Sequence, residues 1–151
     1  MRELTENIEN QFVQLRDTLL KMIETVPEKL MFTSPMPAGQ SFQGTCGECI
    51  LRSAGAAEQA FGGIMTRLWD DPFEWTLPES LATAEKMREY VIEVDQQRAR
   101  CFQFIKDDAE LLKLIPAPED LRPVQSVLLD ALSRSNFLLG QAVILYRASV
   151  G

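Results

Sequence analysis

The chain has 151 residues and a formal net charge of −7, with 46% hydrophobic and 25% charged residues. This length and composition are ordinary for a globular domain with one core, and we expect a single domain over residues 1–151. Phosphate binding needs clusters of Lys and Arg, whereas the basic residues here are scattered singly along an acidic chain. We therefore expect no nucleic-acid partner.

Two further features indicate the cytoplasm. No apolar stretch approaches the roughly 20 residues that span a bilayer, and residues 1–6 lack the apolar core of a signal peptide. The three cysteines are an odd number, which fits a disulfide framework poorly, and cytoplasmic thiols stay reduced. We expect a cytoplasmic protein with free thiols and no membrane partner.

The most informative count is the absence of histidine from the sequence. Histidine is the commonest neutral metal ligand and the usual general base near pH 7. No Ser-His-Asp or Cys-His arrangement can therefore exist, and the sequence also has no Gly-rich phosphate loop. We expect neither a metal nor another cofactor.

Four stretches carry apolar residues at helical steps of three or four. The first covers residues 4–26, with an inner face that begins at Leu4, and ends at Pro27. The second follows a Pro/Gly loop and runs to about residue 68, with Thr45 and Glu48 at capping-box spacing. Its residues expected to face inward are Cys46, Ile50, Ser53, Ala57, Phe61 and Ile64. The loop after it carries acidic residues among aromatic ones, and we interpret it as a helix-terminating turn rather than an acid/base pair.

The third helical stretch is expected to start at Ser80 as its N-cap and to reach Ile105. The fourth covers residues 124–146, and Asp107 and Asp108 between the two are interpreted as solvated loop charge. No segment is typical of a strand. The sequence therefore predicts an all-α fold, a four-helix bundle in a single domain.

The order of several motifs resembles a known family. The first helix is followed by VPEKL (26–30), the second contains ILRSAGAAE (50–58), and LLDALSRSNFLLGQ (128–141) lies near the C-terminus. This order is similar to the DinB-like (damage-inducible, YfiT-type) bundle family, which includes thiol-dependent transferases and isomerases. The resemblance covers nearly the whole chain. It implies up-down-down-up topology and homodimers that pair through bundle faces.

The resemblance also implies a divalent-metal site with three histidines, none of which this chain has. The matching positions are Arg52 in the second helix and Arg134 and Leu138 in the fourth. A guanidinium stays protonated and has no lone pair to give, and leucine has no donor atom. We therefore expect no metal-dependent enzyme, because the Lewis-acid activation that the family metal implies is lost.

Arg52 and Arg134 admit two interpretations. If both face the cavity that the family metal would occupy, their guanidiniums could hold a carboxylate or phosphate beside Leu138. Alternatively, Glu48 and Asp130 could neutralise them, since each acid precedes its arginine by four residues.

The segment TCGECILR (45–52) places Cys46 and Cys49 at the start of the second helix. A helix N-terminus lowers a thiol pKa, which makes Cys46 a candidate nucleophile or redox thiol. A thioredoxin-like pair needs a βαβ setting, and a zinc site needs more ligands than Cys101 could add. The remaining interpretation is two small buried residues near the inner face of the helix.

We expect a metal-free DinB-like protein that serves as a small-molecule (anionic ligand) binding or interaction module. The alternative is a thiol-dependent transferase or isomerase that holds an anionic substrate with Arg52 and Arg134 and uses Cys46 as nucleophile. A third possibility is a structural dimer without a ligand. In the expected homodimer, the small residues of the second helix would allow close packing of a partner helix: Gly55, Gly62 and Gly63.

Overall fold

Most of the chain forms four long helices in a computed structural model that describes residues 1–35, 44–75 and 78–150. These helices are α1 (Glu3–Thr25), α3 (Cys46–Thr66), α5 (Ala84–Phe104) and α6 (Val124–Val150). The shorter elements are α2 (Glu28–Met31), α4 (Pro72–Trp75), η1 (Pro78–Leu81), η2 (Asp108–Leu112), β1 (Leu114–Pro116) and β2 (Leu121–Pro123). The prediction of a mostly helical, all-α fold is confirmed.

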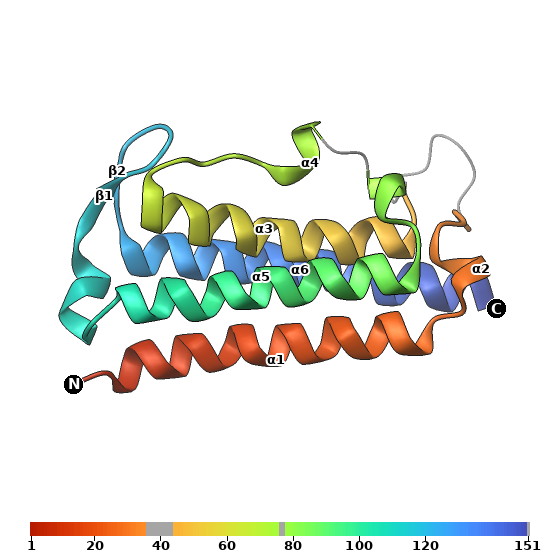
Figure 1. Cartoon of the computed structure of the whole chain (residues 1–151), viewed down its shortest axis with the longest axis horizontal. Helices are drawn as coiled ribbons and strands as arrows, with labels where there is room; N and C mark the ends of the chain where they lie inside the picture. The colour runs from red at the N-terminus through yellow and green to blue at the C-terminus, as the bar shows by residue number, and fades with distance from the viewer. Residues whose placement is uncertain (36–43, 76–77, 151) are drawn as a thin grey trace.

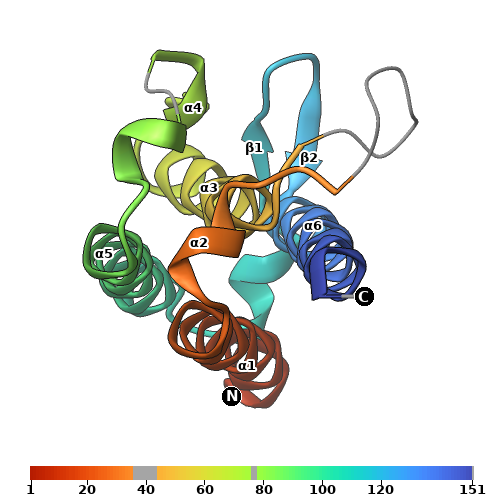
Figure 2. The ribbon, with the colours of Figure 1, turned by 90° about the vertical axis from the view of Figure 1, so that its right-hand side faces the viewer.

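The long helices lie side by side, with α1 and α6 running in one direction and α3 and α5 in the other (Figure 1). The largest helix–helix interfaces join α3 to α6, α3 to α5, and α1 to α5. Viewed end on, α4 and the β1–β2 hairpin lie on the side of α3 that faces away from α1 (Figure 2). Helix α3 is therefore the centre of the fold and is partly covered by these short segments.

The buried faces follow the helical periodicity. The six residues expected to face inward on α3 are all buried: Cys46, Ile50, Ser53, Ala57, Phe61 and Ile64. At the centre of the core, the Phe12 ring of α1 lies 5.0 Å from that of Phe61 and 6.1 Å from that of Phe102, measured between centroids. Burial of such large apolar side chains is the main source of stability for the fold. Leu4, expected on the inner face of α1, is 48% exposed.

The helix boundaries depend on local caps. Helix α1 ends before Pro27, as expected, because a proline disfavours the helical conformation of the residue before it. The Thr45 hydroxyl accepts a hydrogen bond from the Glu48 backbone N–H at 3.1 Å, which confirms the predicted cap of α3. The predicted cap at Ser80 is wrong. Ser80 lies in η1, and Thr83 caps α5 by accepting from the Lys86 N–H.

Two further expectations are corrected, one for the segment between α5 and α6 and one for the end of α6. The segments β1 and β2 form a short antiparallel pair with Ile115 opposite Arg122. Each strand has only three residues, one of them a proline, so no alternation of polar and apolar residues was available to reveal it. The fourth helix begins at Val124 as expected but extends beyond residue 146 to Val150.

Asp107 and Asp108 are not solvated loop charge. The Asp107 carboxylate accepts from the Glu110 N–H at 3.2 Å and caps η2, whereas Asp108, at the start of η2, caps α1. Its carboxylate accepts hydrogen bonds from the backbone N–H of Leu4 at 3.1 Å and of Thr5 at 2.8 Å. The hydroxyl of Thr5, which is fully buried, donates to the same carboxylate at 2.7 Å. Burial opposes ionisation of Asp108, but these hydrogen bonds outweigh it and lower the pKa. Arg2, the N-cap residue, contributes no side-chain cap of its own.

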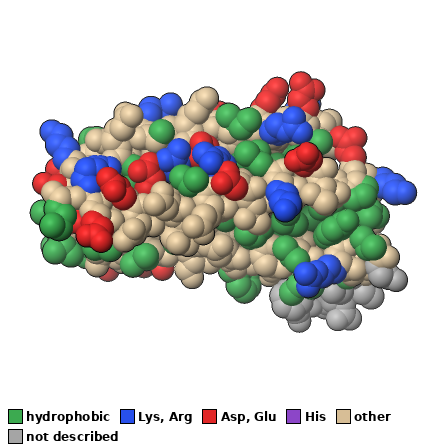
Figure 3. Space-filling model, turned by 90° about the horizontal axis from the view of Figure 1, so that it is seen from below, with side chains coloured by type: hydrophobic (Ala, Val, Ile, Leu, Met, Phe, Trp, Pro, Cys, Tyr) green, Lys and Arg blue, Asp and Glu red, His purple; other side chains and the backbone are tan. Residues whose placement is uncertain are grey.

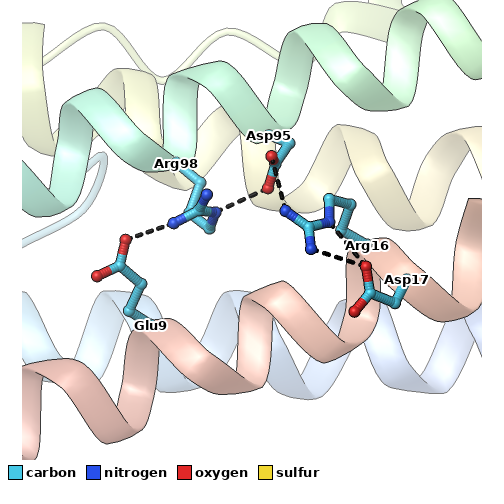
Figure 4. A network of polar contacts seen from close by, with 5 residues as sticks. All are labelled: Glu9, Arg16, Asp17, Asp95 and Arg98. Carbon is cyan, nitrogen blue, oxygen red and sulfur yellow. Dashed lines mark hydrogen bonds and ion pairs between the residues drawn. The ribbon is translucent and has the colours of Figure 1, made fainter.

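An ion-pair network joins α1 to α5. Side chains of both charges form a band along the face seen in Figure 3. In the network itself, Arg98 contacts Glu9 and Asp95, and Arg16 contacts Asp95 and Asp17 (Figure 4). Burial opposes ionisation of Asp95, yet the hydrogen bonds from Arg98 and Arg16 prevail and lower its pKa. The network connects the two helices outside the apolar core.

Candidate functional site

Helices α3 and α6 are joined by a reciprocal hydrogen-bonded pair. The Ser53 hydroxyl donates to the Ser135 carbonyl at 2.8 Å, and the Ser135 hydroxyl donates to the Ser53 carbonyl at 2.8 Å. Each serine directly follows an arginine in the sequence, Arg52 on α3 and Arg134 on α6. The pair therefore fixes the relative positions of these two arginines.

A groove of about 200 Å³ lies beside this pair. It is lined by Arg52, Gly55, Ala56, Gln59, Asp71, Phe73, Arg134 and Leu138. The structure thus brings together the three residues that the family resemblance indicated. A second hollow of about 220 Å³ shares Ala56, Gln59 and Arg134 with the first and adds Trp69, Arg122 and Asp130 among its lining residues. Arg134 lies where the two hollows meet.

Arg52 forms the ion pair that its spacing predicted. Its Nε lies 3.0 Å from Oε1 of Glu48, and the two side chains are 39% and 28% exposed. Such a half-exposed pair contributes little to stability. The guanidinium carbon also lies 5.9 Å from the centre of the Phe73 ring. Only Nε is used in the ion pair, and within the described part of the chain the two terminal nitrogens form no hydrogen bond.

The predicted pair between Asp130 and Arg134 is wrong. Asp130 instead lies 3.0 Å from Nη2 of Arg122, an arginine of β2 that also donates to Ser126. The hairpin brings Arg122 to this acid, and nothing in the helical spacing could reveal that contact. Arg134 is exposed and forms no ion pair with any carboxylate of residues 1–35, 44–75 or 78–150. It remains an unneutralised cation at the groove.

Two aromatic side chains pack directly on glycines of α3, Phe73 at the groove and Trp69 at the second hollow, and together they form an aromatic wall. A Cβ at Gly63 would lie 2.1 Å from the Trp69 ring, and a Cβ at Gly55 would lie 2.9 Å from the Phe73 ring. The expected partner helix is therefore not what approaches α3, because aromatic side chains of the same chain cover Gly55 and Gly63. At Gly62 the nearest atom is the Leu68 carbonyl oxygen at 3.7 Å, so this glycine serves no such contact.

Hydrogen bonds hold this wall in place. The Asp71 carboxylate accepts from the Phe73 N–H at 2.9 Å, and the Gln59 side chain donates to the Trp69 carbonyl at 2.8 Å. The indole N–H of Trp69 donates to the carbonyl of Pro116 in β1 at 3.2 Å. The expected packing of aromatic residues in the segment after α3 is found, but Pro72–Trp75 form the short helix α4 within it.

Behind the wall lies a polar pair that the sequence did not indicate. The Tyr90 hydroxyl donates to Oε2 of Glu58 at 2.6 Å, and the Tyr90 ring packs edge-on against Phe73 with centroids 5.6 Å apart. Burial and then the Glu58 charge raise the pKa of Tyr90, so the phenol stays protonated. The two residues lie 32 positions apart in the sequence, and helical periodicity cannot predict a contact at that separation. Tyr90 therefore supports the groove from behind.

The cysteines lie outside the groove. Cys46 is 1% exposed and Cys49 is 5% exposed. Burial raises the pKa of Cys46 to about 12 and that of Cys49 to about 11, which agrees with the interpretation as two small buried residues and not with the alternative of a reactive thiol. Loss of water around the thiolate outweighs the helix N-terminus. The Cys49 thiol donates to Oε1 of Gln141 at 3.7 Å, and Cys101 is buried and free as well.

Within residues 1–35, 44–75 and 78–150, no group of three or more metal-ligating side chains could hold an ion. In the same ranges, no helix is both long and apolar enough to cross a membrane. No protein-family model matches the chain, and no curated protein or solved structure is significantly similar to it. What the chain binds is therefore inferred from the chemistry of the groove.

Proposed function

We propose that this protein is a metal-free, DinB-like four-helix bundle that binds a small carboxylate or phosphate ligand between α3 and α6. The observation that carries this proposal is Arg134, an exposed guanidinium that lines the groove and pairs with no carboxylate of the described residues. Its planar, permanently charged head matches the two oxygens of a carboxylate or phosphate.

Arg52 lines the same groove from α3. Its pairing with Glu48 uses Nε and leaves the two terminal nitrogens for a ligand. Among the groove residues, Asp71 is the acid, and its carboxylate is directed to the Phe73 N–H. Two arginines and one acid line the groove, and Glu48 offsets the charge of Arg52, so Arg134 is the cation left without a partner for an anion.

The body of the ligand is expected to be apolar or aromatic. Phe73 and Leu138 supply apolar surface beside the two arginines, and Tyr90 holds the Phe73 ring in place. Binding sites of this kind combine apolar walls with a few polar groups that orient the ligand. Aryl carboxylates and aryl phosphates carry both features.

The directions of the long helices support the family part of the proposal. An arrangement with α1 and α6 parallel, and with α3 and α5 opposed to them, is the up-down-down-up order that the resemblance implies (Figure 1). The same proposal places the protein in the cytoplasm, where its three thiols stay reduced.

The thiol-dependent transferase or isomerase is the weaker candidate. Cys46 is not among the residues that line the groove, and its pKa of about 12 leaves almost no thiolate near pH 7. A nucleophile needs the thiolate and a path to the substrate. Arg52 and Arg134 therefore suit binding of an anion better than they suit a thiol reaction.

We also propose a homodimer, but through the outer face of α6. Three large apolar side chains are exposed there: Leu129 (49%), Phe137 (64%) and Ile144 (53%). Gly140 lies between the last two, and a Cβ there would meet nothing within 4 Å. Exposed apolar stripes of this kind are typical of interfaces.

The spacing of the residues on this face allows it to pack against the same face of a second copy of α6. In an antiparallel pair with its two-fold axis between residues 136 and 137, Leu129 would oppose Ile144, and Ser133 would oppose Gly140. Phe137 would pack against Asn136 beside the axis, so the face would contact itself as an isologous dimer requires. The outer face of α6 therefore fits its own copy.

A thermal-shift comparison of matched compounds tests the anion proposal. Benzoate is paired with benzamide, which has nearly the same shape without the charge, and phenyl phosphate with phenol, which lacks the phosphate group. A ligand that binds only the folded state raises the melting temperature by mass action, by several degrees at about 100 times its Kd. We expect shifts for the anions alone. Equal shifts within each pair, or no shift at millimolar concentration, would contradict the proposal.

A further inference from the structure

A groove separate from the two hollows described above lies between α6 and α1, on the other flank of α6. It has a volume of about 270 Å³ and is lined by Thr18, Lys21, Met22, Thr25, Val26, Val143, Tyr146 and Arg147. Helix α6 thus presents Arg134 and Leu138 to one groove, and Val143 and Tyr146 to the other. The two grooves share no lining residue and can be tested separately.

The floor of this groove is apolar, and cations stand at its edge. Met22, Val26 and Val143 are the apolar residues, and Val26 is only 4% exposed. Lys21 and Arg147 are exposed, and neither forms an ion pair within the part of the chain that the structure describes.

The C-terminal ends of α1 and α6 lie near this groove, and their partial negative charges oppose the binding of an anion. Helices α1 and α6 run in the same direction, and the groove includes residues from the last two turns of α1 (Figure 1). Each helix C-terminus carries about half a negative charge, so that the two together amount to roughly one. Lys21 and Arg147 supply two full positive charges. These two cations outweigh the dipoles, and no acid is among the lining residues of the groove.

We infer that this groove binds a single-chain amphipathic carboxylate, with its hydrocarbon tail on Met22, Val26 and Val143 and its head group at Lys21 and Arg147. The volume limits the tail, because drug-sized ligands occupy pockets of about 300–1,000 Å³ and this groove is slightly smaller. A medium-chain fatty acid fits both the apolar floor and the positive edge.

Isothermal titration of the full chain with three ten-carbon probes tests the inference. Decanoate, decanol and decyltrimethylammonium carry similar tails and differ in head-group charge. Decanoate is expected to bind at least tenfold more tightly than the other two, and less tightly as salt is raised, because screening weakens exposed charge pairs. Octanoate should bind roughly fifteenfold more weakly than decanoate, since each buried methylene is worth about a fourfold change in affinity. No binding of decanoate, or equal or tighter binding of the alcohol or the cation, overturns the inference.

Two charge-matched variants locate the site. Lys21→Glu with Arg147→Glu is expected to weaken decanoate binding at least tenfold. Lys86→Glu with Arg88→Glu makes the same change in net charge on exposed positions of α5 and is expected to leave binding unchanged. An equal effect of both double variants would mean that net charge alone acts, which overturns the inference. The exposure of all four side chains means that folding should survive, as circular dichroism will check.

Two single variants complete the test: one fills the α1–α6 groove, and the other alters the α3–α6 groove. Val143→Trp should block the tail and weaken decanoate binding by tenfold or more. Arg134→Met, which removes the residue proposed to hold an anion in the α3–α6 groove, should leave the decanoate affinity of the α1–α6 groove unchanged. If Arg134→Met abolishes decanoate binding while Val143→Trp does not, the fatty acid occupies the other groove and this inference fails, while the proposed function stands.

Discussion

Ser53 and Ser135 bind each other across α3 and α6, each donating its hydroxyl to the other's backbone carbonyl at 2.8 Å with both residues fully buried. A pair of this kind defines one register between the two helices, because a shift of either helix breaks both bonds. Arg52 and Arg134 precede the serines and are held at a fixed separation on the groove side. The buried pair thus supports the arrangement of the proposed anion site.

Removal of this pair should lower stability by a modest and measurable amount. Ser53→Ala and Ser135→Ala are each expected to reduce the free energy of unfolding by about 1 kcal/mol, the usual net worth of one hydrogen bond. Ser133→Ala, on the exposed side of the same helix, is the control and should change it by less than about 0.5 kcal/mol. Urea unfolding of the three variants measures the difference. Equal effects of Ser53→Ala and Ser133→Ala would contradict the structural role of the pair.

The thiols should be inert in the folded protein. Burial raises the pKa of Cys46 to about 12 and that of Cys49 to about 11, so both should react slowly with a disulfide reagent at pH 8 and rapidly after unfolding. The unfolded state loses its thiol protons first, at a pKa near 8.5, so these groups make stability fall as pH rises above that value. Rapid labelling of the native protein at neutral pH would contradict the buried geometry and revive the alternative of a reactive Cys46.

Gly63 and Gly62 should respond in opposite ways to the same substitution. Gly63→Ala places a methyl group 2.1 Å from the Trp69 ring and must displace it, which lowers stability and shifts tryptophan emission in a Trp75→Phe background. Gly62→Ala meets nothing closer than 3.7 Å and should stabilise the helix by about 0.5–1 kcal/mol. Thermal unfolding of both variants provides the comparison. Stabilisation by Gly63→Ala would mean that Trp69 does not lie on this glycine.

Dimerisation should depend on the outer face of α6. Sedimentation equilibrium is expected to give a dimer mass for the unmodified chain and a monomer mass for Phe137→Glu. Phe104→Glu is the matched control, because Phe104 is 52% exposed but lies on α5, away from the proposed interface. A chain carrying Ser133→Cys, mixed with one carrying Gly140→Cys, should form a disulfide across the proposed two-fold axis when a mild oxidant is added. A monomer mass for the unmodified chain at high concentration would remove this proposal.

Periodicity predicted the long helices because their buried faces repeat every three or four residues over twenty or more positions. It also placed Thr45 and the inner face of α3 correctly. The β1–β2 pair and the Asp108 cap could not be predicted, because one has three-residue strands and the other joins residues about one hundred positions apart. The Ser80 cap was wrong because Thr83, three residues later, is an equally suitable hydroxyl.

For the candidate site, the resemblance supplied Arg52, Arg134 and Leu138, and the structure places all three on one groove. The contacts that decide what the arginines can do were not visible in the sequence. Glu48 pairs with Arg52 as helical spacing predicts, whereas Asp130 pairs with Arg122 because a hairpin brings that arginine close. The aromatic wall depends on residues that cover glycines of α3, and the sequence marked those glycines without identifying what covers them.

The most direct test of the proposed function is isothermal titration of phenyl phosphate into the unmodified chain, Arg134→Met and Arg88→Met. Arg88 is an exposed arginine of α5 outside both grooves, so it controls for the loss of one positive charge. Hydrogen bonds to charged groups are worth about 1.5–3 kcal/mol, which corresponds to a loss of roughly 10-fold to 150-fold in affinity. We predict that loss for Arg134→Met and unchanged binding for Arg88→Met. Equal affinity of all three proteins, or no binding by the unmodified chain, would contradict an anion site between α3 and α6.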